Sequence, residues 1–90
     1  MRKSHELLLQ LFHDPKYDFS KVTMEYVDRG SPGDRSIVSG VQVTRLDAQY
    51  IEVDAITHTA YIPYHRLRNI FYDDTEVWGL HTDDKNESMR

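Results

Sequence analysis

The short connections between apolar segments in the second half of the chain constrain its fold most. Segments rich in β-branched and aromatic residues predict five strands there, at 41–46, 50–54, 60–63, 69–72 and 76–79. Only a few residues join several of these segments, whereas parallel neighbours need crossovers of a dozen or more residues. The strands should therefore pair antiparallel, and residues 73–75 suit a hairpin turn.

The N-terminal part of the chain predicts one short helix. Apolar side chains recur at spacings of three and four within residues 4–12, which is the repeat of a helix with one buried face. Ser4 is a suitable N-cap. The helix should end near His13, because Asp14 precedes Pro15 and a residue before proline is pushed away from helical angles.

One more strand and a tight loop complete the expected fold. Residues 21–28 alternate between apolar and polar side chains, and Gly30, Pro32 and Gly33 then mark a surface loop. We predict the α+β class, with a small twisted antiparallel sheet of about five or six strands, partly barrel-like, and one N-terminal helix over an opening. Residues 1–80 form the single domain, and residues 81–90 form a polar flexible tail.

Composition excludes several kinds of function. The formal net charge of −4 argues against broad coating of a nucleic-acid backbone, although a small anion site remains compatible with it. The chain has no cysteine, so it has no disulfide, thiolate metal ligand or cysteine nucleophile, and an intracellular location, cytoplasmic or nuclear, fits best. No apolar run approaches the roughly 20 residues of a membrane span, and we expect no membrane partner.

The five histidines show no spacing typical of a metal site, and we expect neither a metal nor a cofactor. No nucleophile elbow or phosphate-binding lysine loop is present. Phosphoesterases that use two histidines need paired H-x-[ST] motifs. Here His58 and His81 are each followed directly by threonine, which is the wrong spacing.

Two basic spots remain as candidate anion contacts. Arg29 precedes a glycine-rich turn whose backbone N–H groups suit an anion. In "YHRLR" one helical turn would present His65 and Arg68 on one side while Leu67 packs inward. Each spot also has a purely structural interpretation, a solvated arginine in a plain turn or a corner in which His65 bonds a backbone carbonyl. Spacing alone favours the structural interpretation.

Three stretches of the sequence resemble the RNA cyclic-group end recognition domain, a family of small archaeal and eukaryotic proteins. They are the proline-containing acidic segment after the helix, "DRGSPGD" at 28–34, and "IPYHRLRNIFYDDTEVW" at 62–78. The third stretch is the most specific. This chain has Phe12 and His13 where members often have a tryptophan before the first aspartate.

The resemblance implies an RNA-binding module that recognises RNA 3′ ends bearing a 2′,3′-cyclic phosphate, in RNA processing or repair and beside RNA-processing enzymes. Carried over residue by residue, it implies four phosphate or RNA contacts: Arg29, Asp34, His65 and Arg66. Arg68 is an auxiliary candidate, and exposed aromatics such as Tyr64 or Tyr72 would stack on bases.

The leading hypothesis is a non-catalytic RNA-end binding domain. One alternative is a protein-interaction or scaffolding domain whose histidine-arginine corner is purely structural. Another is a weak cyclic phosphodiesterase that uses His65 as general acid or base, for which no partner histidine is visible in the sequence. Proximity of His58 or His13 to His65 would favour it.

Overall fold

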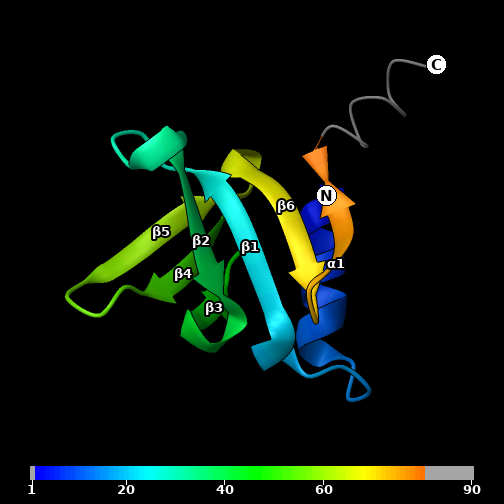
Figure 1. Cartoon of the computed structure of the whole chain (residues 1–90). Coiled ribbons are helices and arrows are strands. Elements are labelled where there is room, and N and C mark those ends of the chain that lie inside the picture. The colour runs from blue at the N-terminus through cyan, green and yellow to red at the C-terminus, as the bar shows by residue number, and fades with distance from the viewer. Residues whose placement is uncertain (1, 81–90) are drawn as a thin grey trace.

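Two antiparallel sheets and one helix make up the part of the chain that the computed structural model describes, residues 2–80 (Figure 1). One sheet has the strand order β2-β1-β6-β7 and the other the order β3-β4-β5. The elements follow one another as α1 (Lys3–His13), β1 (Val22–Val27), β2 (Arg35–Ser39), β3 (Val43–Leu46), β4 (Tyr50–Asp54), β5 (Thr59–Pro63), β6 (Leu67–Tyr72) and β7 (Thr75–Gly79). Four single 3-10 turns connect them, at Phe19–Lys21, Pro32–Asp34, Gly40–Gln42 and Tyr64–Arg66.

The predicted α+β class with an N-terminal helix is confirmed, but the strand count was too low. The strand that was missed is β2, which lies at the edge of its sheet and pairs only with β1. Its two large apolar side chains face opposite ways, with Ile37 70% exposed and Val38 buried. Such a strand has almost no apolar periodicity. The partly barrel-like form is also corrected, because the sheets of residues 2–80 remain separate and do not close.

Side chains from the helix and from both sheets share one core. Six of them are completely shielded from solvent: Leu8, Val22, Met24, Ile51, Leu67 and Ile70. The alternation expected in β1 is visible in the burial of Val22 and Met24 between more exposed neighbours. In Figure 1, α1 lies behind β6 and β7. Leu8 and Leu11 of α1 reach the core from there.

The helix ends where the sequence predicts but begins differently. Its last residue is His13, and Asp14 before Pro15 has extended angles. The N-cap is Arg2, without a side-chain hydrogen bond, so the prediction that Ser4 caps the helix is wrong. Ser4 is 2% exposed because it stands four residues before Leu8 and therefore faces the core.

The hairpin predicted at 73–75 joins β6 to β7. Tyr72 pairs with Thr75, which leaves a loop of two residues, Asp73 and Asp74. Both have positive φ, 50° and 68°, as a type I′ turn requires. In β6 the two buried residues are Leu67 and Ile70, and the pairing with β7 shifts register between Ile70 and Phe71.

The tail predicted at 81–90 lies outside the described residues. Within residues 2–80, no helix is both long and apolar enough to cross a membrane.

Candidate functional site

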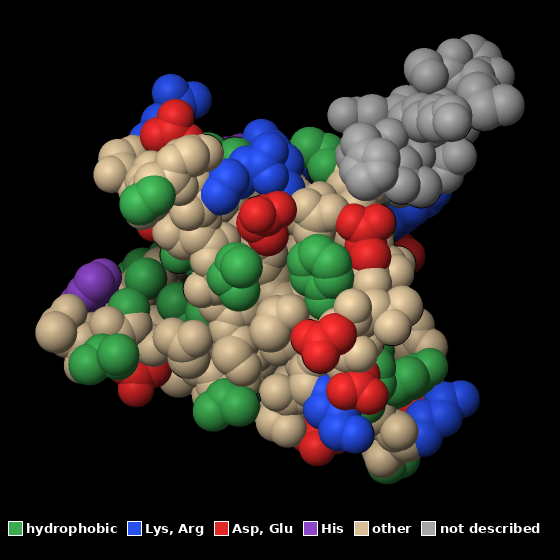
Figure 2. All heavy atoms as spheres, in the orientation of Figure 1, with side chains coloured by type: hydrophobic (Ala, Val, Ile, Leu, Met, Phe, Trp, Pro, Cys, Tyr) green, Lys and Arg blue, Asp and Glu red, His purple; other side chains and the backbone are tan. Residues whose placement is uncertain are grey.

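Antiparallel pairing of β1 with β6 brings the two basic spots to one end of the sheet. Tyr26 near the end of β1 pairs with Leu67 at the start of β6. Arg29, which follows β1, therefore lies at the same end of the strand pair as His65 and Arg66, which precede β6. Figure 2 shows basic side chains at this end, with an acidic side chain beside them. Hydrogen bonds from Ser36 and Ser31 lower the pKa of Asp28, and the nearby charge of Arg66 lowers it further.

Hydrogen bonds to Asp28 hold the loop after β1 in shape. Its carboxylate oxygen Oδ2 accepts from the hydroxyls of Ser36, at 2.6 Å, and Ser31, at 2.9 Å. These bonds, the Ser36 bond first, lower the pKa of Asp28. The backbone N–H of Asp28 donates to the carbonyl of Asp34 across the loop, at 2.8 Å. The carboxylate of Asp28 is thus committed within the protein.

The predicted site residues of this loop have different environments. Asp34 has a φ of 57°, and its Oδ1 accepts from the N–H of Gly30 at 3.2 Å, so its carboxylate is used to close the loop. Gly30 has a φ of 96°, which favours glycine. Arg29 is exposed and makes no ion pair with the carboxylates of residues 2–80. Arg29 is therefore the free donor of the loop.

The corner between β5 and β6 is a single 3-10 turn, Tyr64–Arg66, directly after Pro63. His65 and Arg66 are exposed, whereas Leu67 is completely buried. Arg68 is half-buried, and its Nη1 donates to the carbonyls of His65, at 3.2 Å, and Leu67, at 3.1 Å. Arg68 thus holds the corner, and it has fewer donors left for a ligand than Arg66.

The expectation that Tyr64 is an exposed stacking platform is wrong. Its side chain is 4% exposed, its ring stacks on His5 with centroids 4.3 Å apart, and its hydroxyl donates to the carbonyl of Asp47 at 2.8 Å. Burial, and next the charge of Asp47, raises the pKa of Tyr64 to about 12, so the hydroxyl keeps its proton. Tyr64 pins the corner to the β3–β4 hairpin.

Tyr72 does not lie beside this corner. It is the last residue of β6, roughly 17 Å from Leu67 at the rise of a strand. Its ring meets Tyr17 edge to face, and its hydroxyl accepts from the N–H of Asp18 at 2.9 Å. An RNA end held at His65 would therefore not have Tyr72 as its first stacking partner.

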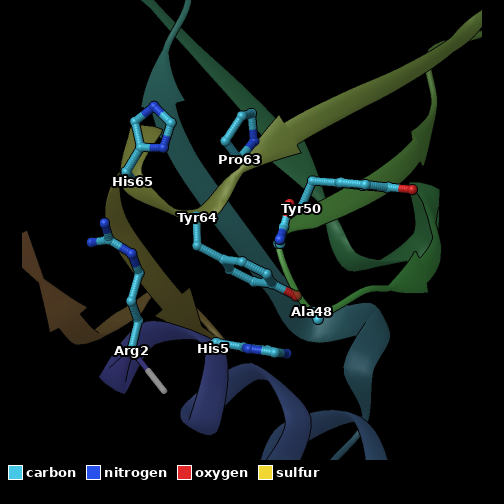
Figure 3. A pocket seen from close by; sticks show the side chains of 8 residues that line it. Arg2, His5, Ala48, Tyr50, Pro63, Tyr64 and His65 are labelled. Carbon is cyan, nitrogen blue, oxygen red and sulfur yellow. The ribbon is translucent and has the colours of Figure 1, made fainter.

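A cleft of about 580 Å³ opens beside the corner. His65, Tyr64 and Pro63 line it from the corner, and Arg2 and His5 line it from the start of α1 (Figure 3). The remaining lining residues come from the β3–β4 hairpin: Ala48, Gln49 and Tyr50. None of the lining residues is acidic.

The sequence interpretation missed Arg2 and His5 as site residues. A signal for His5 existed, because it stands three residues before Leu8 and six before Leu11 and so lies toward the apolar face of the helix. No signal pointed to Arg2, since its proximity to the corner follows from the packing of α1. Within residues 2–80, no group of three or more histidine, aspartate or glutamate side chains is arranged to hold a metal ion.

Comparison with known proteins identifies the family. The model of the MJ1316 RNA cyclic group end recognition domain matches residues 1–79. The chain belongs to this family. The RNA cyclic group end recognition domain therefore covers all the elements described above, including the cleft and both basic spots.

The relatives of this domain are archaeal proteins named UPF0248. The protein of Archaeoglobus fulgidus is 38% identical over 64 residues, which cover 71% of this chain and 86% of the relative. The protein of Pyrobaculum islandicum is 31% identical over 68 residues, which cover 76% of this chain and 81% of the relative. No solved structure matches the chain.

Proposed function

We propose that the chain is a non-catalytic RNA-binding module that recognises RNA ends bearing a 2′,3′-cyclic phosphate, in RNA processing or repair. The observation that carries this proposal is the exposure of His65 and Arg66 on a corner that other residues hold together. Arg29, exposed at the same end of the sheet, supplies a third donor. The name of the family supports the choice of ligand.

The chemistry of the three donors suits this ligand. A cyclic phosphate diester carries one negative charge, so two or three well-aimed donors satisfy it. Arginine presents a planar fork of N–H groups, and protonated histidine donates from both ring nitrogens. Asp28, whose charge offsets part of that of Arg66, keeps the local potential modest. We therefore expect end-specific binding without strong attraction to RNA backbones.

The corner residues argue against a purely structural role for His65. Tyr64, Leu67 and Arg68 make the contacts that hold the turn. The imidazole of His65 has no hydrogen bond to any residue in the range 2–80, and the side chain of Arg66 is exposed. Both side chains are therefore available to a ligand and are not needed to hold the corner together.

The positions of His58 and His13, the two histidines considered above as partners of His65, give no support to phosphodiester cleavage. His58 precedes the five residues of β5, which extend roughly 17 Å before the corner. His13 lies at the opposite end of α1 from His5, roughly 12 Å along the helix. Neither is placed to act with His65 as an acid-base pair.

The test measures the affinity of the full chain for one short RNA with three different ends: 2′,3′-cyclic phosphate, 3′-phosphate and 3′-hydroxyl. The cyclic end should bind tightest. His65→Ala should weaken binding of the cyclic end roughly tenfold, the effect of losing one hydrogen bond to a charged group. Because His65 is exposed, the melting temperature should change little.

His58→Ala is the matched control, an exposed histidine in the β4–β5 turn, and should bind as the unmodified chain does. Equal affinity for the three RNA ends would refute the proposal. If His65→Ala and Arg66→Ala lower the melting temperature and RNA does not raise it, the scaffolding role is correct instead.

A further inference from the structure

His5 is a buried side chain whose ring nitrogens take no part in the hydrogen bonds that hold residues 2–80 together. It is 7% exposed and stacks on Tyr64 with an angle of 24° between the rings, but its ring nitrogens have no hydrogen-bond partner in residues 2–80. In this part of the chain, no fully buried side-chain nitrogen lacks a partner. The ring nitrogens of His5 must therefore reach solvent, and the cleft that His5 lines is where they do so.

The cleft has the size and lining of a nucleoside site. Its volume of about 580 Å³ lies within the range of small-molecule pockets, roughly 300 to 1,000 Å³. The half-buried rings of Pro63 and Tyr50 provide apolar surface in the cleft. Gln49 and His5 add hydrogen-bonding groups that suit the polar edge of a base.

One end of the cleft is suited to a phosphate. Figure 3 shows Arg2 and His65 on one side of Tyr64, while the hydroxyl end of Tyr64 points toward Ala48 on the other. Arg2 and His65 are both exposed, and no carboxylate lines the cleft. His65 thus belongs both to the proposed phosphate contacts and to the wall of the cleft.

We propose that the cleft receives the terminal nucleoside of the RNA end and that His5 donates or accepts a hydrogen bond to it. This inference rests on the proposed function, because a 2′,3′-cyclic phosphate is attached to the ribose of that nucleoside. A phosphate held at His65 therefore leaves the ribose and base beside the cleft. The stacked ring of Tyr64 holds His5 in place for the contact.

The test titrates the full chain with the four nucleoside 2′,3′-cyclic monophosphates and, separately, with inorganic phosphate, and follows the imidazole signals by NMR. The cyclic nucleotides should shift the signals of both His5 and His65, whereas inorganic phosphate should shift only those of His65. If none of the four nucleotides shifts the imidazole signals of His5, the inference is wrong. This measurement needs no variant.

His5→Phe is the corresponding variant, because it keeps a ring on Tyr64 and removes the nitrogens. It should weaken binding of the cyclic nucleotides about three- to tenfold, the effect of one lost hydrogen bond, and leave binding of inorganic phosphate unchanged. His58→Phe, outside the cleft, is the control. Affinity equal to that of the unmodified chain in a folded His5→Phe would also overturn the inference.

The two proposals fail in different ways. RNA with a cyclic end could bind tighter than RNA with a 3′-hydroxyl while the NMR signals of His5 do not shift. The proposed function would then stand, and the proposal that the cleft binds the terminal nucleoside would be wrong. If His5-dependent binding of cyclic nucleotides occurs without preference among RNA ends, the cleft is a nucleotide site and the proposed function is wrong.

Discussion

At the scale of single residues, Asp28 links the loop after β1, which carries Arg29, to the corner before β6, which carries Arg66. The hydroxyls of Ser36 and Ser31 donate to its carboxylate, and the charge of Arg66 lies close enough to lower its pKa further. The loop that carries Arg29 therefore depends on an ionised Asp28. Acidification should loosen this loop before it affects the core.

The stability contributed by Asp28 should depend on pH. Because its pKa is lowered from 3.8 in the folded chain, the contribution is complete above that value and is lost as pH falls through the lower folded pKa. Asp28→Asn should melt below the unmodified chain at about pH 7, and the gap should close as pH falls below 3.8 through the lowered folded pKa. Thermal melts followed by circular dichroism measure the gap.

Ser36→Ala tests the cause of this effect. Removing the largest influence on the pKa should bring Asp28 closer to its ordinary value and flatten the same acid dependence. A gap between Asp28→Asn and the unmodified chain that stays constant across this pH range would contradict the assignment.

The β6–β7 hairpin positions the corner at the level of secondary structure. Its two-residue loop fixes the pairing of β6 with β7, and the same strand pairs with β1 on its other edge. His65 and Arg66 directly precede β6, and the pairing of Leu67 with Tyr26 of β1 sets where they emerge. Both loop residues, Asp73 and Asp74, have left-handed angles that glycine adopts at lower cost.

Asp74→Gly should stabilise the protein. Removing the left-handed strain of a side chain at φ 68° should raise the free energy of unfolding by about 0.5 to 1 kcal/mol. For a domain of this size that corresponds to a melting temperature roughly 2 to 8 °C higher. Urea and thermal unfolding measure both quantities.

Asp74→Val is the control at the same position and should have the opposite effect. A β-branched residue is disfavoured at positive φ, so this substitution should destabilise the hairpin. RNA-end affinity should be unchanged by Asp74→Gly, since the turn lies at the far end of β6 from His65. A melting temperature that falls with glycine would contradict the type I′ assignment.

The charge of the whole molecule determines how salt acts on binding. The chain carries a net −4, and its exposed basic contacts are concentrated at one end of one sheet. Long-range attraction to RNA should therefore be weak, and under the proposed function a few local donors would provide the binding. This is the opposite of a domain that coats a nucleic-acid backbone.

Binding of a cyclic-phosphate RNA end should have a shallow salt dependence. With about two phosphates contacted, the slope of log K against log salt should be about −1.4, so a rise from about 50 to about 200 mM should weaken binding about sevenfold. Fluorescence anisotropy over this range measures the slope. Arg66→Ala should reduce its magnitude by about 0.7. A slope several times steeper would indicate backbone binding instead.

Local patterns were sufficient for most elements but not for the site. Alternation predicted β1, and "YIEVD" predicted β4 with its observed bounds. Pro15 explained where the helix ends. The edge strand β2 was not predicted, because only Val38 of its apolar residues is buried and the strand shows no clear alternation. His5 and Arg2 were not predicted, because their neighbours in the cleft are residues 48–50 and 63–65, far away in the chain.

The sequence by itself determined the α+β class, the helix end, the antiparallel hairpin at 73–75 and the two basic spots, because periodicity and turn residues act over a few positions. Only the tertiary structure decided that Arg29 and His65 share one end of a sheet. It also decided that Tyr64 is buried and that His65 is exposed. These outcomes depend on strand register and helix packing, which join residues far apart in the chain.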